Sequence, residues 1–350
     1  MSLLKLLYWL GPWMDQKKEP SHIERKEHIH DDIRIWLYEP PKCTGTIFIL
    51  PGLHQDGPGD PRLERFAKVL ANAGIRVGVP FLPTAQNLVM VPTLLNEARR
   101  ALRVFLRLIS GDCGIFSISA SSIAALMLAA DDEFSPRIKG VMLFGGVSNW
   151  KEALLFAAKG EHRDPLNLPV IFLNLWSAMQ CKFQNESDLI QAWYDFIHET
   201  WEKEDMRYLK DYGPVAQRIA ATLVEADQEI FLMGCSLAEG GVELVEDTLS
   251  RDVPGTEWLS PKAYLKRITM PVHVAHGRDD VVVPWQQAFS IGEWGDCQER
   301  VYITGFYDHT GISSTMKWLR LIPQIPLELY RSLRLLRGML SISHASVKKA

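Results

Sequence analysis

Cysteine is scarce in this sequence, and the few cysteines present are not grouped. Five of them are scattered over 350 residues, and no two stand in C-x-x-C spacing. This scarcity excludes a disulfide framework and a zinc site built on paired cysteines. It is typical of proteins that fold in a reducing compartment, so we predict a cytoplasmic location.

The chain also lacks an excess of one charge and any motif for a bound cofactor. Its 38 lysines and arginines oppose 42 aspartates and glutamates, which gives a net charge of −4, and no basic run occurs. A nucleic-acid partner is therefore not expected. Neither G-x-x-x-x-G-K-[ST] nor G-x-G-x-x-G is present, so no loop is predicted to bind nucleotide phosphates, and no motif predicts a metal.

Long hydrophobic runs are missing as well. The apolar N-terminal segment, residues 1–13, is interrupted by Gly11 and Pro12 and is too short to span a bilayer. It lacks an A-x-A-like cleavage site, so a secretory signal is not predicted. Two interpretations stay open for this segment: a helix packed on the following domain, or an anchor at a membrane surface.

What the chain does have is a regular alternation of apolar strands and amphipathic helices. A hairpin is expected around residues 30–32. The strands expected next are residues 46–50, 75–79, a segment at 114 and 138–144, and the helices between them are residues 63–73, 93–109 and a segment from 120. Such alternation is typical of right-handed crossovers and a mostly parallel sheet.

The run IFSISASSIA, residues 115–124, predicts a buried strand, then small residues, then an apolar helix. A serine on a sharp strand-to-helix turn can present its hydroxyl as a nucleophile, provided that the residues two before and two after it are small. With Ser119 as the nucleophile these flanking residues are Ser117 and Ser121. Both are small, although neither is glycine.

Two other interpretations of this run are open. Ser122 lies between Ala120 and Ala124 and also satisfies the size rule, but it would move the turn three residues further from the strand, so Ser119 is favoured. Alternatively, the serines only cap the start of a helix.

An activated serine needs a base and an acid, which follow it along the chain in this arrangement. The segment over residues 268–284 predicts a short strand at Pro271–Ala275 that ends before Gly277, and Asp280 is favoured over Asp279 as the acid on the following loop. The segment ERVYITGFYDHTG predicts one more strand, with His309 on its trailing loop. The stretch between Asp280 and His309 has room for one helix and one strand, as expected for the last two strands of a sheet.

The negative charge that develops on an attacked carbonyl needs N–H donors. A loop rich in glycine and proline over residues 51–62 follows an expected strand, and Gly52 would let its backbone approach the serine closely. We therefore predict the backbone N–H groups of Leu53 and Ala120 as an oxyanion hole.

On these motifs the chain resembles the α/β-hydrolase superfamily. The resemblance spans about residues 22–336 and rests on the loop at 51–54, the SISAS turn, HGRDDVVVP and YDHTG. It implies a mostly parallel eight-stranded sheet flanked by helices, a serine hydrolase of the esterase or lipase kind, and no organic cofactor. The turn without glycine departs from the usual pattern of such proteins.

Strand signals stop for more than a hundred residues after residue 149, and helical patterns cover 188–204, 214–226 and 229–250. In similar proteins, helices inserted between the sixth and seventh strands form a cap. We expect a core at residues 22–149 and 263–350, a helical cap or lid at 150–262 and a separate N-terminal segment at 1–21.

Several side chains of the expected cap have two possible roles: they line an apolar cleft for substrate, or they form the core of the cap itself. They are Trp176, Met179, Phe183 and Trp193. The cap also contains GCSLA, in which Ser236 satisfies the small-residue rule. Too few strands follow Ser236 to complete a sheet, so it is rejected as the nucleophile.

The C-terminal segment, residues 324–340, predicts an amphipathic helix with arginines opposite its apolar face. The residues expected on that apolar face are Ile325, Leu329, Leu333, Leu336 and Leu340. The helix either packs on the sheet or, together with residues 1–13, contacts a membrane surface.

The resulting expectation is an enzyme that cleaves a carboxylic ester, of an apolar or lipid-like acyl group, through Ser119, His309 and Asp280. Acyl transfer to another acceptor and amide cleavage stay open on the same fold. So does a non-catalytic protein that binds a small molecule at its cap.

Overall fold

The computed structural model describes residues 2–11, 15, 17–109, 111–159, 166–201, 212–307, 309 and 325–343. Its contacts divide the chain into two compact units. Unit 1 comprises Met1–Asn149 and Trp258–Ala350, and unit 2 comprises Trp150–Glu257. The N-terminal segment is thus part of unit 1, and unit 2 ends five residues before the boundary expected from the sequence.

Unit 1 is built on one eight-stranded sheet in the order β1-β2-β4-β3-β5-β6-β7-β8. The strands are β1 (Arg25–His30), β2 (Ile33–Tyr38), β3 (Gly45–Leu50), β4 (Ile75–Pro80), β5 (Cys113–Ile118), β6 (Ile138–Phe144), β7 (Val272–Gly277) and β8 (Val301–Thr304). β2 is antiparallel to both of its neighbours, and the other pairings are parallel. The predicted mostly parallel eight-stranded sheet is therefore confirmed.

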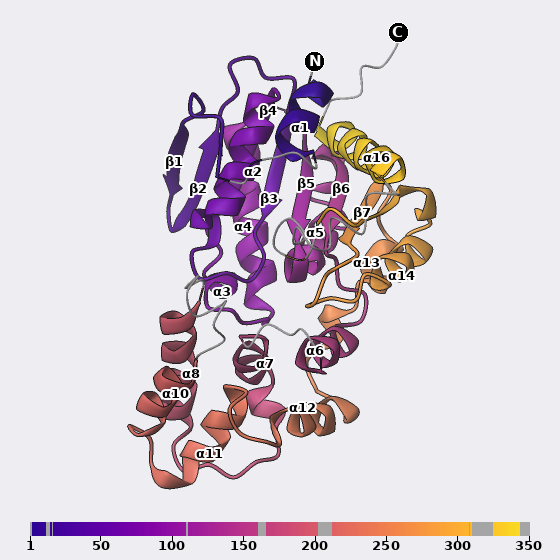
Figure 1. Ribbon diagram of the computed structural model, residues 1–350. Coiled ribbons are helices and arrows are strands. Elements are labelled where there is room, and N and C mark those ends of the chain that lie inside the picture. The colour runs from indigo at the N-terminus through magenta and orange to yellow at the C-terminus, as the bar shows by residue number, and fades with distance from the viewer. Residues whose placement is uncertain are drawn as a thin grey trace. The chain divides into compact units, whose positions relative to one another are not determined.

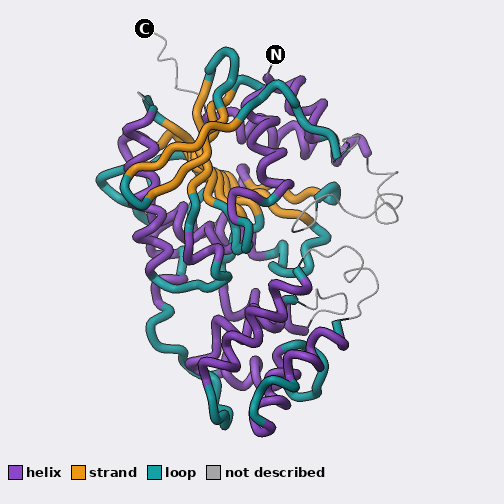
Figure 2. The backbone as a smooth tube through the Cα atoms, turned by 90° about the vertical axis from the view of Figure 1, so that its left-hand side faces the viewer, coloured by secondary structure: helices purple, strands orange, loops and turns teal. Residues whose placement is uncertain are grey.

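Helices cover both faces of this sheet (Figures 1 and 2). The helices of unit 1 are α1 (Ser2–Leu10), α2 (Pro61–Asn72), α3 (Pro83–Gln86), α4 (Thr93–Leu108), α5 (Ser122–Ala129), α13 (Lys262–Leu265), α14 (Gln287–Trp294) and α16 (Ile325–Ser343). α1, α2 and α16 contribute to the hydrophobic cluster on one face, and α4, α5, α13 and α14 to the cluster on the other. Because both faces are buried, the inner strands read as nearly continuous apolar runs, as GTIFIL of β3 does.

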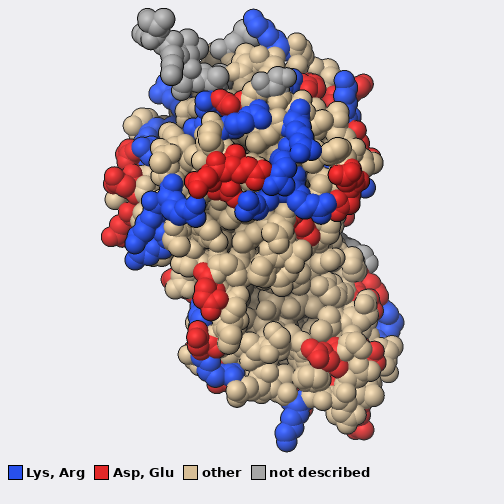
Figure 3. Space-filling model, turned by 180° about the vertical axis from the view of Figure 1, so that it is seen from behind, with Lys and Arg blue, Asp and Glu red and all other residues tan. Residues whose placement is uncertain are grey.

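α4 shows how the sequence divides between core and solvent. Its apolar residues recur at helical spacing and are buried, as Ala98, Leu102 and Phe105 are. Arg99, Arg100 and Arg103 on its other side pair with acids, as Arg103 does with Glu133 at 2.6 Å. Figure 3 shows the side of the molecule opposite to that of Figure 1, where acidic and basic side chains of unit 1 lie interspersed. Such exposed pairs each contribute less than about 1 kcal/mol, so burial of the apolar face contributes more to the stability of the fold.

α16 packs on the sheet with a face different from the one its sequence predicts. Leu335, Met339 and Ile342 are buried together with Leu336, whereas the remaining predicted residues, Ile325, Leu329, Leu333 and Leu340, are only half-buried. The helix is turned because the polar residues Glu328 and Ser332 also lie on its buried side. α1 packs against both α2 and α16, with Leu6 and Leu10 buried.

A glutamine side chain of α14 fixes the chain where unit 1 ends. Gln287 is buried, and its Oε1 accepts the N–H groups of Ser148 at 2.8 Å and Asn149 at 3.2 Å. Its Nε2 donates to the Asn149 carbonyl at 3.0 Å. The last two residues before unit 2 are therefore held by the core itself.

Unit 2 is helical throughout its described residues. Its helices are α6 (Trp150–Lys159), α7 (Asn167–Leu175), α8 (Glu186–Thr200), α10 (Gly213–Ala220), α11 (Glu225–Gly234) and α12 (Gly241–Ser250). The stretch predicted over residues 229–250 is divided into α11 and α12, because Ser236 and Gly240 between them have φ values of +63° and +94°, which are incompatible with a continuing helix.

The large aromatic side chains of unit 2 pack on one another. Trp193 is fully buried, and its ring lies 5.1 Å from that of Trp176 and 5.3 Å from that of Phe172. Met179 is buried, whereas Phe183 is 39% exposed and lies 4.6 Å from Trp176. These contacts favour the interpretation that the aromatic residues form the core of unit 2.

Candidate active site

The turn after β5 holds Ser119 in a strained backbone conformation. β5 ends at Ile118, a short 3-10 turn covers Ser119–Ser121, and α5 begins at Ser122 (Figure 1). The φ of Ser119 is +54°, a left-handed value that costs a residue with a side chain roughly 1–2 kcal/mol. Such strain gathers at functional sites, and it directs the side chain out of the strand-to-helix turn.

The neighbouring serines have structural contacts that fix this turn. Ser121 is fully buried, and its hydroxyl donates to the Pro51 carbonyl, which ties the loop after β3 to the turn. Ser122 has helical backbone angles, and its Oγ accepts the N–H of Val147 at 3.2 Å. The hydroxyls of Ser121 and Ser122 are thus used in hydrogen bonds that hold the turn. Ser119 has the strained backbone, and among the described residues its side chain does not serve to hold the turn.

Asp280 lies on the loop after β7 and is almost completely buried. Its Oδ1 accepts the backbone N–H groups of Val282 and Val283, both at 2.8 Å. Its Oδ2 contacts two imidazoles, His309 Nδ1 at 2.8 Å and His276 Nε2 at 3.0 Å. Both carboxylate oxygens are thus hydrogen-bonded, as a buried charge requires.

These contacts keep the Asp280 carboxyl ionised. Burial alone acts to raise its pKa, but the charge of His309 and the hydrogen bonds from His276 and His309 outweigh burial and lower the pKa well below its usual value. A carboxylate that stays charged can orient an imidazole and stabilise the imidazolium that forms when that imidazole takes up a proton.

His309 follows β8, and its Nδ1 is the atom turned to Asp280. A Cβ added to Gly145, at the end of β6, would lie 3.7 Å from the His309 ring and 3.8 Å from Asp280 Oδ2. Gly145 has a φ of +65°, so a residue with a side chain would be strained there as well. The ends of β6, β7 and β8 therefore meet around the His309 ring.

The start of the loop that carries His309 is held by a buried acid of α16. Glu328 is fully buried, and its Oε2 accepts the hydroxyl of Thr304 at 3.2 Å and the N–H of Gly305 at 2.9 Å. Its other oxygen accepts from Arg331. Sequence reasoning did not identify Glu328, because one acid in an amphipathic helix gives no signal of burial.

The loop after β3, from which an oxyanion-hole donor is predicted, lies beside the turn. A Cβ added to Gly52 would lie 3.6 Å from Ser119 Cβ and 3.4 Å from the Ile118 carbonyl, so the loop after β3 approaches the turn closely. Within the described part of the chain, the N–H of Leu53 makes no backbone hydrogen bond. The backbone of Ala120 belongs to the turn itself.

The structure thus joins two of the three predicted side chains directly and places the third at the end of β5, which β6 separates from β7. Asp280 and His309 form a hydrogen bond, and Ser119 follows β5, the neighbour of β6 in the sheet. Among the described residues, Ser119 Oγ makes no hydrogen bond with His309. His276 also contacts Asp280, and sequence reasoning did not identify it.

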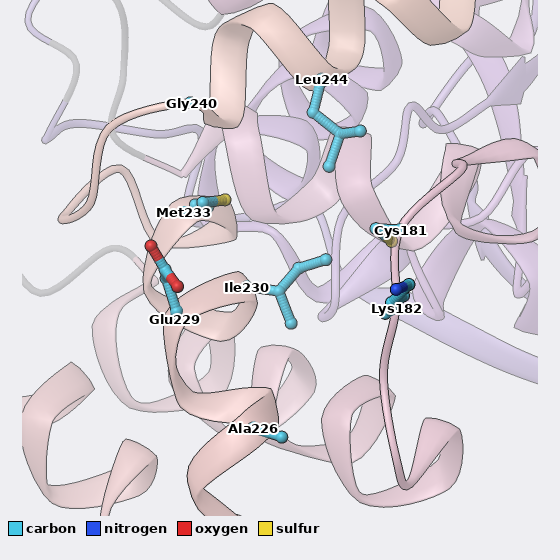
Figure 4. A pocket seen from close by; sticks show the side chains of 8 residues that line it. All are labelled: Cys181, Lys182, Ala226, Glu229, Ile230, Met233, Gly240 and Leu244. Carbon is cyan, nitrogen blue, oxygen red and sulfur yellow. The ribbon is translucent and has the colours of Figure 1, made fainter.

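Unit 2 contains a shallow pocket of its own, of about 350 Å³, shown in Figure 4. Its lining combines apolar side chains with one base and one acid: Cys181, Lys182, Ala226, Glu229, Ile230, Met233, Gly240 and Leu244.

Within the described residues of the chain, no three or more His, Cys, Asp or Glu side chains are grouped so that they could hold a metal ion.

Comparison with known proteins gives likeness of structure alone. No family model and no curated protein matches the chain. Among solved structures, an acylaminoacyl peptidase of Pyrococcus horikoshii aligns with a TM-score of 0.49 and 13% identity over 94% of this chain. This chain spans 43% of that peptidase, less than half of its length.

Two further solved structures align over nearly their whole length. Est1E of Butyrivibrio proteoclasticus has a TM-score of 0.45 and 13% identity, covering 91% of this chain and 98% of its own. A thermostable carboxyl esterase of Bacillus coagulans has a TM-score of 0.46 and 11% identity, covering 92% and 99%. The strand order of unit 1, its antiparallel second strand and the left-handed serine turn after β5 show that this chain has the α/β-hydrolase fold.

Proposed function

We propose that this chain is a serine hydrolase that cleaves carboxylic esters, with Ser119 as nucleophile, His309 as general base and Asp280 as the acid that orients it. The observation that carries the proposal is the hydrogen bond of 2.8 Å between Asp280 Oδ2 and His309 Nδ1. Because Nδ1 donates to a charged carboxylate, Nε2 of the same ring is the nitrogen that can accept a proton.

The reaction proceeds in two balanced halves. Ser119 Oγ attacks the ester carbonyl while its proton passes to His309 Nε2, and collapse of the tetrahedral intermediate expels the alcohol, which takes that proton. Water then attacks the acyl-enzyme, His309 again accepts and returns a proton, and the carboxylic acid leaves. In each half the negative oxygen is stabilised by the N–H groups of Leu53 and Ala120.

The test is labelling with a fluorophosphonate probe, which reacts with activated serines. We expect labelling of the wild-type chain, loss of labelling in Ser119→Ala, and full labelling in Ser236→Ala, a matched serine that also has a positive φ. Labelled Ser119→Ala, or an unlabelled wild-type chain, would overturn the proposal.

The substrate class is proposed as esters of apolar or lipid-like acyl groups. It is tested with p-nitrophenyl esters of increasing acyl length, where kcat/KM should rise from acetate to medium chains. Acyl transfer is distinguished by adding an alcohol or amine as competing acceptor. A product that contains the acceptor in preference to the free acid identifies a transferase or an enzyme of mixed activity.

A second candidate is a non-catalytic binding protein on this fold. It is favoured by the serine turn without glycine and by the missing hydrogen bond between Ser119 and His309 among the described residues. Turnover on any ester that depends on Ser119 would exclude this candidate.

We further propose that the chain is cytoplasmic and contacts an anionic membrane surface through its terminal helices. No described helix is long and apolar enough to cross a membrane. Leu4 and Tyr8 of α1 and Tyr330 of α16 are more than half exposed, and α1 packs on α16. The one acid of these helices, Glu328, is fully buried, so their exposed charges are basic and complement anionic lipid.

Co-sedimentation with vesicles tests this contact. We expect binding to phosphatidylserine-containing vesicles and weaker binding to pure phosphatidylcholine. The double variant Tyr8→Ser/Tyr330→Ser should lose binding to the phosphatidylserine-containing vesicles. Phe289→Ser, which removes an exposed ring on α14, should retain that binding. Equal binding of both variants, or none by the wild-type chain, would contradict the contact.

A further inference from the structure

His276 is a second buried histidine at the Asp280 carboxylate. It lies on β7, is fully buried, and has no role in the proton transfers proposed above. Its Nε2 lies 3.0 Å from Asp280 Oδ2 and 3.1 Å from the carbonyl oxygen of Val283. Both contacts are with groups that can accept a hydrogen bond.

The position of the His276 proton follows from these contacts. A carbonyl oxygen and an ionised carboxylate only accept, so Nε2 must carry a proton and donate it to them. Nδ1 is buried and has no hydrogen-bond partner among the described residues. A second proton on Nδ1 would be an unsatisfied buried donor, which favours the neutral ring with its proton on Nε2.

One oxygen of Asp280 thus receives two imidazole donors. Oδ2 accepts from His276 and from His309, while Oδ1 is occupied by two backbone N–H groups. A donor that shares Oδ2 withdraws negative charge from it and thereby weakens the interaction of that oxygen with His309. It also prevents the carboxylate from rotating about its own bond.

Among the described residues, the other charges near His276 and Asp280 are paired or screened by water. Glu328 of α16, which packs on β7 and β8, is buried but paired with Arg331. α5 contains no ionisable residue, and Glu293, the acid of α14, is exposed. Lys262 of α13 lies over an indole ring, and Lys139, near the start of β6, is ion-paired. Arg278 and Asp279, next to Asp280 on its loop, are only half-buried, so water screens them.

We propose that His276 is a positioning residue: it holds the Asp280 carboxylate in the orientation that hydrogen-bonds His309, and it thereby sets the proton affinity of the His309 ring. The inference rests on the proposed hydrolase activity and deepens it. His276 touches neither the serine nor the reacting atoms and acts only through Asp280.

The test compares three variants by the pH profile of kcat/KM. His276→Leu removes the donor, His276→Gln keeps an N–H near the position of Nε2, and His273→Leu is the control. His273 is a buried histidine of the same strand, but it hydrogen-bonds Tyr302 at 2.9 Å and does not contact Asp280. Thermal unfolding of each variant shows whether it is folded.

We expect His276→Leu to move the acidic limb of the profile to higher pH by about half to one unit, because Asp280 Oδ2 then interacts with His309 alone. His276→Gln should restore the wild-type limb, and His273→Leu should leave it unchanged. An unmoved limb in folded His276→Leu, or an equal shift in His273→Leu, overturns the inference.

A second readout does not depend on turnover. In the Ser119→Ala background, the far-downfield proton NMR signal of the Asp280–His309 hydrogen bond should move further downfield when His276 is also replaced by leucine. If this signal responds while the wild-type chain lacks esterase activity, the proposed function fails and the positioning role stands. If the chain is active and neither signal nor pH limb responds, the positioning role fails alone.

Discussion

The two units of this chain offer a comparison, because each contains a serine at a positive φ and a buried aspartate. In unit 1 these are Ser119, with a φ of +54°, and Asp280; in unit 2 they are Ser236, with a φ of +63°, and Asp227. Both serines are flanked by small residues in the sequence. Both aspartates accept two backbone N–H groups.

The difference lies in what surrounds these features. Ser119 follows a strand and opens a helix, whereas Ser236 follows the end of α11, where a left-handed residue commonly terminates a helix. Asp280 contacts two imidazoles, whereas His198, the one histidine within the described residues of unit 2, is exposed. A strained serine and a buried aspartate therefore occur in both units and do not by themselves indicate catalysis. Among the described residues, an imidazole contacts the aspartate only in unit 1, so only there can a proton be transferred.

The largest expected effect separates the two aspartates. Asp280→Asn should lower kcat by about three to four orders of magnitude, because the amide cannot stabilise the imidazolium of His309. Asp227→Asn should leave kcat near wild type and destabilise unit 2 by about 1–3 kcal/mol, since an amide N–H₂ then faces the N–H groups of Gln184 and Asn185. Ester hydrolysis and urea unfolding measure both, and a similar loss of kcat in the two variants would break the comparison.

The next effect is the dependence of stability on pH. The pKa of Asp280 is lower in the folded chain than in the unfolded one, so its ionisation stabilises the fold above about pH 4, the ordinary value for an aspartate. This contribution is lost as the pH falls below that value toward the lowered pKa of the folded state. Urea unfolding of wild type and Asp280→Asn should therefore give free energies that converge on acidification, and a constant difference would contradict the assignment.

A smaller effect distinguishes two glycines with positive φ, Gly145 in unit 1 and Gly240 in unit 2. Alanine at either position should cost about 1 kcal/mol of stability, because the left-handed conformation disfavours a side chain. Gly145→Ala should also lower kcat/KM by roughly three- to tenfold, since the added methyl meets the His309 ring and Asp280. Gly240→Ala should not, and equal kinetics in the two variants would show that Gly145 does not shape the site.

The smallest effect concerns Ser236 itself. Glycine tolerates the left-handed end of a helix better than serine does, and the Ser236 hydroxyl is buried without a partner among the described residues. Ser236→Gly should therefore stabilise unit 2 by up to about 1 kcal/mol, measured by chemical denaturation. Destabilisation would mean that the hydroxyl has a role that its surroundings do not indicate.

Much of the fold could be predicted from the sequence, because its signals are local. The alternation of apolar runs and amphipathic helices gave β3 through β6 within a few residues, and the hairpin of β1 and β2 was predicted from its polar turn. The face of α16 could not be predicted, since the buried polar contacts of Glu328 depend on where β8 ends. The division of the stretch over residues 229–250 was missed, although Gly240 and Gly241 were a visible signal.

The candidate site divides in the same way. The order of Ser119, Asp280 and His309 along the chain indicated which residues to consider, because strand ends gather at one edge of a parallel sheet. The sequence cannot show that His276 shares Asp280 Oδ2, since a histidine in an apolar strand is equally compatible with burial against any neighbour. That contact depends on the loop that turns Asp280 back toward its own strand.

The clamp that Gln287 forms on Ser148 and Asn149 has a consequence for how such a chain can change over evolutionary time. Gln287 belongs to unit 1 and holds the last two residues before unit 2. The position of these residues therefore does not depend on the helices that follow them. Insertions, deletions or wholesale exchange of the helical stretch can then accumulate without disturbing the strand ends where the acid and the imidazole meet.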